Sequence, residues 1–203
     1  MKGILLSGGL DSLALAYWQK PQIAFTVDYG QKAAEAEIRA SAKITKDLGI
    51  RHVIITIDVT QVGSGDLLNT TSCQTAPKSD WWPFRNQMLL TTVCSYIMSH
   101  DIAVKELLFA TVANDSYHKD GTKNFFSAFN DLLACQEGDI QILTPAINMS
   151  AVELIRTSKV TLEKLSWGHS CHKSNYACGE CRGCYKHQNT LDELGWSLTE
   201  TIK

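Results

Sequence analysis

The first residues of the chain place an apolar run, a glycine turn and a helix-forming stretch in direct succession. Residues 2–6 are apolar, residues 7–12 read Ser-Gly-Gly-Leu-Asp-Ser, and residues 13–18 are rich in leucine and alanine. The same order returns with an apolar run at 23–27 and an Ala-, Glu- and Lys-rich stretch at 32–48 that suits a helix. Strands that alternate with helices predict a parallel sheet with right-handed crossovers.

The later segments extend this pattern. Apolar and β-branched runs predict three further strands at 52–57, 106–110 and 140–143. Helices are predicted at 86–100, 124–135 and 150–158, and long polar loops at 58–82 and 114–122. We therefore expect an α/β, Rossmann-like domain with a parallel five-stranded sheet over residues 1–160, followed by a small C-terminal segment at 161–203.

Composition and charge exclude several classes of protein. With 44% hydrophobic and 20% charged residues among 203, the chain is neither disordered nor fibrous. A formal charge of −2 disfavours a dedicated nucleic-acid or membrane-surface module, which would carry an excess of positive charge. The N-terminal apolar run turns polar at Ser7, and no apolar run reaches the roughly 18 residues that a membrane span needs. We expect a cytoplasmic protein without a membrane partner.

The Ser-Gly-Gly-Leu-Asp-Ser turn has the chemistry of an anion-binding loop. Gly8 and Gly9 let the backbone approach a ligand, and the helix that follows presents unpaired N–H groups and the positive end of its dipole. Ser7 and Ser12 add hydroxyl donors, and Asp11 could hold a Mg²⁺ ion that bridges phosphates. An ordinary strand-to-helix turn is the alternative, because short glycine motifs often occur without a ligand.

Four of the seven cysteines lie within fourteen residues of one another near the C-terminus, at Cys171, Cys178, Cys181 and Cys184. Two Cys-x-x-Cys steps outside a secreted protein more often hold metal than form disulfides. Four thiolates close a tetrahedral shell, so the pattern predicts a structural zinc site with no open position for catalysis. Two alternatives stay open: one ligand could be His169, His172 or His187, or the thiols could be reactive.

The glycine turn resembles the SGGxDS motif of the PP-loop ATP pyrophosphatases. Three further motifs make the resemblance more specific: Asp-Tyr-Gly-Gln at 28–31, Pro-Phe-Arg-Asn at 83–86 and the cysteine cluster. Together they resemble the 7-cyano-7-deazaguanine synthase (QueC) family over essentially the whole chain. The resemblance implies a PP-loop domain with a zinc knuckle, in which the loop holds the leaving pyrophosphate while an acceptor oxygen attacks the α-phosphate of ATP.

The resemblance also implies a role for each matching residue. The residues implied in ATP binding are Leu6, Ser7, Gly8, Gly9, Leu10, Asp11, Ser12 and Asp28. Those implied in binding the deazaguanine substrate are Tyr29, Gln31, Arg85, Asn86 and Asp120. Those implied in catalysis are Ser7, Asp11, Ser12 and Arg85. ATP and Mg²⁺ would serve the reaction, and Zn²⁺ would be structural.

Simpler explanations stay open for some of these residues. Asp28 ends a strand and could cap the next helix, Asp120 could be a solvated turn residue, and Arg85 could be an exposed loop arginine. Trp81 and Trp82 could stack on a base, but tryptophan more often packs in a core.

Two positions depart from the family pattern. Ala151 stands where the family usually has a lysine, and Thr122 stands where it would place an arginine after the aspartate of its purine-recognition loop. A cation on a transferring phosphate can stabilise the transition state strongly. These two differences therefore bear on the rate of adenylation and on the identity of the acceptor.

The resemblance implies ATP-dependent adenylation of 7-carboxy-7-deazaguanine, followed by amidation and conversion to the nitrile, 7-cyano-7-deazaguanine. Ammonia is the expected amine, and a homodimer is expected from the family. A first alternative transfers the activated acyl group to a protein or nucleic-acid amine, with a co-encoded protein partner, as in diverged copies within antiphage defence systems. A second is a tRNA-modifying PP-loop enzyme, which the charge of −2 disfavours. A third is a non-catalytic nucleotide-binding subunit.

Overall fold

The computed structural model describes residues 1–196. The strands are β1 (Lys2–Leu5), β2 (Ile23–Asp28), β3 (Arg51–Thr56), β4 (Glu106–Phe109) and β5 (Gln141–Leu143). The helices are α1 (Leu10–Gln19), α2 (Ala34–Leu48), α3 (Arg85–Ser99), α4 (Lys123–Leu133), α5 (Ala151–Ser158), α6 (Leu162–Leu165) and α7 (Arg182–Glu193). Short 3-10 helices are η1 (Thr60–Val62), η2 (Ala113–Tyr117) and η3 (Lys119–Gly121).

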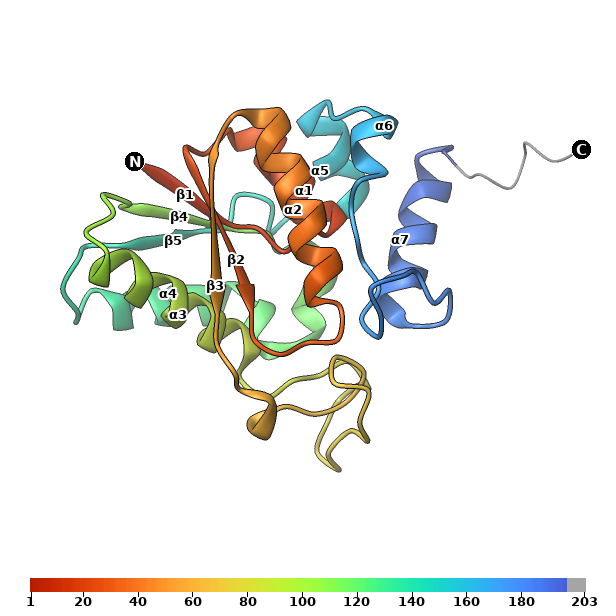
Figure 1. The fold of residues 1–203 in the computed structure, drawn as a ribbon, viewed down its shortest axis with the longest axis horizontal. Coiled ribbons are helices and arrows are strands. Elements are labelled where there is room, and N and C mark those ends of the chain that lie inside the picture. Colours follow the sequence, from red (N-terminus) through yellow and green to blue (C-terminus); the bar gives the residue numbers. More distant parts are fainter. Residues whose placement is uncertain (197–203) are drawn as a thin grey trace, which may run out of the picture.

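The five strands form one parallel sheet in the order β3-β2-β1-β4-β5. Helices cover both faces: α1, α2 and α5 pack on one side, and α3 and α4 on the other (Figure 1). Successive residues of a strand point to opposite faces, so Ile4 enters the first layer and Leu5 the second. A strand buried on both faces must be continuously apolar, which explains the apolar runs in the sequence.

The expected α/β fold with a five-stranded parallel sheet is confirmed. Each predicted strand is present within one residue of its expected bounds, and four of the predicted helices within two; the first helix, expected at 13–18, begins three residues earlier, at Leu10. The sequence did not predict α6 or α7, which lie in the C-terminal segment. Residues 197–203 of that segment lie outside the described residues.

The order of the strands fixes where a ligand can bind. From β1 the chain moves outward to β2 and β3, and then returns to the other side of β1 to form β4. The loops that follow β1 and β4 therefore leave the same sheet edge in opposite directions, and open α/β folds bind ligands in the crevice that this creates. Residues 6–9 and 110–122 are these two loops.

Candidate functional site

The loop between β1 and α1 uses its two glycines differently. Gly8 has a φ of +74°, and a Cβ there would lie 2.7 Å from the carbonyl oxygen of Glu37 and 2.9 Å from Cβ of Ala40. Gly9 is the N-cap of α1 with a φ of −75°, and the nearest atoms to a Cβ there are 3.6 and 3.7 Å away. The backbone conformation and the close neighbours of Gly8 therefore require glycine there, whereas a Cβ at Gly9 would make only ordinary van der Waals contacts.

Two serine hydroxyls hold the loop in shape. Ser12 Oγ donates to the carbonyl oxygen of Gly9 at 3.0 Å, and the hydroxyls of Ser7 and Ser12 are 3.1 Å apart. Within residues 1–196, no side chain caps the N-terminus of α1. The first N–H groups of this helix are thus left for a ligand, as an anion-binding loop requires.

Asp11, in the first turn of α1, faces a lysine from the far end of the chain. Lys186 Nζ on α7 donates to Asp11 Oδ2 at 2.7 Å and to Asp115 Oδ1 on η2 at 2.9 Å. Burial raises the pKa of Asp11, although Lys186 opposes this shift. Asp11 Oδ1 is buried and has no hydrogen-bond partner among residues 1–196. A free carboxylate oxygen beside a phosphate loop fits a Mg²⁺ ligand.

A cleft of about 320 Å³ opens in front of this loop. Its walls come from the glycine loop, from the loop after β4 and from the C-terminal segment. The sequence-predicted residues that line it are Leu6, Ser7, Gly9, Leu10, Asp11, Ser12, Tyr29, Arg85, Asn86 and Asp120. Gly8, Asp28 and Gln31 are not among the lining residues. The glycine loop and most of the expected substrate residues therefore share one cavity.

The side chains of Gln31 and Asp28 form hydrogen bonds within the turn that follows β2. The Gln31 side chain accepts from the Tyr29 N–H at 2.9 Å and donates to Val27 O at 3.2 Å. Asp28 Oδ1 accepts from the Gly30 N–H at 3.1 Å. These bonds fix the turn and aim the buried Tyr29 into the cleft, so a direct contact of Gln31 or Asp28 with a ligand stays a prediction.

Arg85, Asn86 and Asp120 meet at the start of α3. Asp120 Oδ2 accepts from the Asn86 N–H at 3.2 Å, and Asn86 Nδ2 donates to Asp120 O at 2.9 Å. Asp120 therefore satisfies a free N–H at the helix start, a role that sequence spacing did not reveal. Burial opposes the charge of Arg85, but the neighbouring Tyr29 and Asp120 raise its pKa. The guanidinium stays cationic in the cleft.

The two positions that depart from the family pattern have structural roles here. Thr122 is the N-cap of α4, and its hydroxyl accepts from the Phe125 N–H at 3.3 Å. Ala151 is buried as the first residue of α5, directly after the N-cap Ser150. Neither residue lines the cleft.

Sequence reasoning missed three acidic groups that line the cleft: Asp115, which pairs with Lys186, and Glu37 and Asp80. Glu37 on α2 accepts from Gln31 Nε2 at 2.8 Å, and burial raises its pKa to about 7. Asp80, in the long loop, accepts from Arg182 Nη1 at 2.8 Å and lies 3.7 Å from His172 Nδ1. Asp80 thereby ties the long loop to the C-terminal segment. No sequence motif connects the residues that each of these contacts joins, so the contacts could not be predicted.

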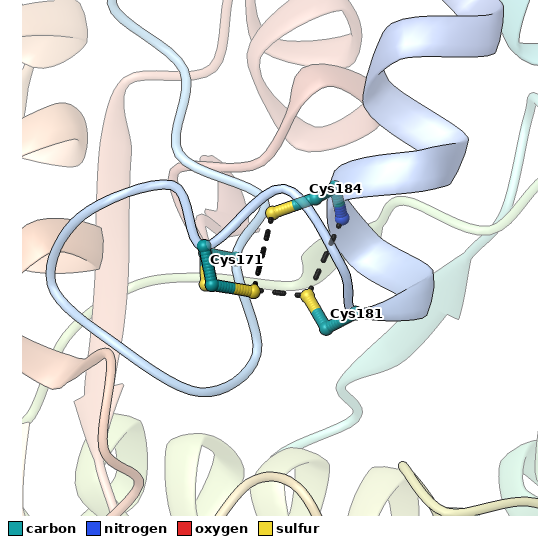
Figure 2. Close-up of side chains that lie close together, drawn as sticks. Cys171, Cys181 and Cys184 are labelled. Atoms are coloured by element: carbon teal, nitrogen blue, oxygen red, sulfur yellow. Dashed lines mark hydrogen bonds between the residues drawn. The ribbon is translucent and has the colours of Figure 1, made fainter.

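The four cysteines predicted to hold zinc come together at the start of α7. Their sulfur atoms all lie within 4.8 Å of one another, with 3.9 Å between Cys178 and Cys184 and 4.0 Å between Cys171 and Cys181. Figure 2 shows the Cys171, Cys181 and Cys184 side chains pointing toward one another. Zinc–sulfur bonds of about 2.3 Å in a tetrahedron separate the sulfurs by about 3.8 Å, so the cluster fits zinc.

Backbone N–H groups contact two of the four sulfur atoms, those of Cys178 and Cys181. Cys181 is the N-cap of α7, and its sulfur accepts from the N–H groups of His172 and Cys184 at 3.3 and 3.4 Å. The backbone N–H of Glu180 contributes most to lowering the pKa of Cys178 to about 7. A bound cation would complete the deprotonation of the set.

The C-terminal segment packs directly on the glycine loop and on the start of α2. The His169 N–H donates to the carbonyl oxygen of Gly8 at 2.8 Å, and Asn175 Oδ1 accepts from the Ala36 N–H at 3.0 Å. A Cβ on Gly183 would lie 1.9 Å from the carbonyl oxygen of Ser170, so glycine is needed where α7 meets the segment. The cysteine cluster therefore holds one wall of the cleft.

The chain is similar to known proteins over nearly its whole length. Residues 3–195 match the family described as "Queuosine biosynthesis protein QueC". The chain belongs to the QueC family. This family includes curated proteins named 7-cyano-7-deazaguanine synthase, and the chain is 30% identical to that of Chlorobaculum parvum over 215 residues, covering 96% of this chain and 93% of the relative. The Desulfitobacterium hafniense protein named 7-cyano-7-deazaguanine synthase 1 is 26% identical, with 93% and 90% covered.

A third QueC relative, from Methanocaldococcus jannaschii, is 27% identical over 220 residues and covers 94% of each chain. The match therefore extends through both the sheet and the cysteine segment. Among the helices within residues 1–196, none is long and apolar enough to cross a membrane.

Proposed function

We propose that this QueC-family protein is an ATP-dependent synthase that activates 7-carboxy-7-deazaguanine by adenylation and converts it to 7-cyano-7-deazaguanine. The observation that carries the proposal is that the glycine loop and Tyr29, Arg85 and Asp120 line one cleft. A nucleotide on the loop and a purine-like acid beside it would be held with their reacting groups together.

In the first step, the triphosphate lies on the glycine loop and the N-terminus of α1. Gly9 lines the cleft and carries no side chain, so phosphate oxygens can approach the free N–H groups of α1, and Ser7 adds a hydroxyl donor. Mg²⁺, held through Asp11, would neutralise charge on the phosphates. A carboxylate oxygen of the substrate attacks the α-phosphorus and pyrophosphate leaves, which gives the acyl-adenylate.

Residues on the opposite wall of the cleft orient the substrate. The cationic Arg85 is suited to a carboxylate or phosphate oxygen, because its planar guanidinium can donate two parallel hydrogen bonds. Asp120 keeps its second carboxylate oxygen for the N–H edge of a guanine-like base, while its first is bound to the Asn86 N–H. The buried Tyr29 ring closes this side of the cleft and packs edge-on against Trp82 at 5.0 Å.

In the second step, ammonia attacks the acyl carbon, the C–O bond to AMP breaks, and an amide forms. Glu37 has a pKa of about 7 and can take the proton that the attacking nitrogen loses. A second ATP then adenylates the amide oxygen. Loss of AMP and of the two amide protons leaves the nitrile.

The cysteine cluster is assigned to a structural zinc ion because four thiolates leave no open coordination position. A cytoplasmic location and a homodimer are part of the same proposal.

The test is a reaction of the purified protein with Mg²⁺-ATP, 7-carboxy-7-deazaguanine and ammonium, followed by mass spectrometry. We expect AMP, pyrophosphate and the 7-amido and 7-cyano products, all dependent on the acid. AMP formation that depends on the acid but yields products only with a different amine would reassign the acceptor. ATP binding without cleavage under any of these conditions would leave a nucleotide-binding subunit in place of a synthase.

A further inference from the structure

Lys186 connects the cysteine segment to the nucleotide loop. It lies on α7, two residues after Cys184, and its ammonium contacts Asp11 in the first turn of α1 and Asp115 on η2. The distances are 2.7 and 2.9 Å. The three elements are far apart in the sequence, so only the folded chain brings this cation next to the glycine loop.

The charges of the cleft favour a cation beside the site of an anionic ligand. The cleft-lining carboxylates are Asp11, Glu37, Asp80, Asp115 and Asp120, and the lining arginines and lysines are Arg85, Arg182 and Lys186. Carboxylates outnumber these cations, so a triphosphate would enter an acidic cavity. Arg182 is already paired with Asp80 at 2.8 Å. Lys186 contacts Asp11 in the first turn of α1, directly after the glycine loop.

The Lys186 ammonium is also free to reach a ligand. Its side chain is 43% exposed, and it lines the cleft. A lysine ammonium has three donors on a flexible stem, and the structure uses two of them for Asp11 and Asp115. One donor therefore stays without a partner among residues 1–196.

We propose that Lys186 is a phosphate-binding residue, and that its ammonium contacts the triphosphate of bound ATP. The zinc-bearing segment then has a second purpose, because it positions the helix that carries this cation. The inference rests on the proposed use of ATP. The competing explanation is that Lys186 only neutralises the two aspartates, so that its loss would weaken ATP binding indirectly.

The experiment compares Mg²⁺-ATP and adenosine binding by calorimetry in the full-length protein. Lys186→Met should weaken ATP binding at least about tenfold and leave adenosine binding unchanged, because adenosine has no phosphates. Lys186→Arg should recover part of the loss. Lys173→Met is the matched control: Lys173 follows Cys171 by two residues and pairs with Asp66 and Glu180, but it does not line the cleft.

A double variant separates direct contact from neutralisation. In Lys186→Met with Asp115→Asn, one carboxylate charge is removed together with the cation. ATP binding that stays weak supports direct contact, whereas recovery to the wild-type affinity overturns it. Equal ATP affinity in Lys186→Met and wild type also overturns it, while the proposed function stands. A wild-type protein that does not bind ATP would refute the proposed function itself.

Discussion

Replacing Gly8 with alanine should destabilise the fold, whereas the same change at Gly9 should spare the fold and weaken ATP binding. Gly8 has a φ of +74°, where an L-residue is strained by roughly 1–2 kcal/mol. The new methyl group would also lie 2.7 Å from the Glu37 carbonyl oxygen. Overpacking of this kind costs about 1–3 kcal/mol.

Strain and overpacking together should lower the free energy of unfolding of Gly8→Ala by at least about 2 kcal/mol. For a chain of this size, that lowers the Tm by at least about 4 °C. At Gly9 the φ of −75° is unstrained and the nearest atoms are 3.6 and 3.7 Å from a new Cβ. Alanine there loses a few tenths of a kcal/mol or more as an N-cap and gains about 0.4–1 kcal/mol through the unfolded chain. The Tm should therefore stay within about 2 °C of wild type.

Thermal unfolding followed by circular dichroism tests the predicted stabilities, and ATP titration by calorimetry tests the predicted affinities. Gly9→Ala should bind ATP more weakly than wild type, because the methyl group fills space in front of the helix N-terminus, and Gly9→Val should bind more weakly still. A wild-type Tm in Gly8→Ala would refute the steric argument. Unchanged ATP affinity in Gly9→Ala would show that phosphates do not approach this part of the loop.

The remaining predictions concern the zinc site, a buried acid and an ion pair. Cys181→Ser should lose one zinc ion per chain and lower the Tm, because metal binding at a closed site contributes folding energy; full metal content by elemental analysis would contradict the assignment. Glu37 has its pKa raised from 4.5 to about 7, so the folded state is favoured with Glu37 protonated and stability should fall by up to about 3 kcal/mol as the pH rises from 4.5 past 7. Glu37→Gln should reduce that pH dependence in urea unfolding, and an unchanged slope would refute it. Asp80→Asn should weaken the contact with Arg182 and increase hydrogen exchange of the 58–82 loop, whereas wild-type exchange would show that other contacts hold the loop.

The sequence was sufficient for the sheet and for the cysteine cluster, for two physical reasons. Strands covered by helices on both faces must be continuously apolar, so runs such as 23–27 are visible without a structure. The four clustered cysteines lie close together in the chain, so their spacing already restricts the geometry.

The rest of the site could not be predicted because it depends on contacts distant in the sequence. Lys186 and Asp11 are separated by 175 positions, and Lys186 and Asp115 by 71. The different roles of Gly8 and Gly9 follow from their φ angles and neighbours, which two adjacent glycines do not reveal. Helix α7 was missed because a cysteine, Cys181, takes the place of an ordinary N-cap.

An oxygen-transfer measurement tests the central claim most directly. If the substrate carboxylate attacks the α-phosphorus, one carboxylate oxygen stays on AMP when the amine displaces it. With 7-carboxy-7-deazaguanine labelled with ¹⁸O in its carboxylate, the account predicts that AMP gains one ¹⁸O atom and pyrophosphate gains none. Unlabelled AMP, or label found in inorganic phosphate beside ADP, would contradict adenylation as the activating step.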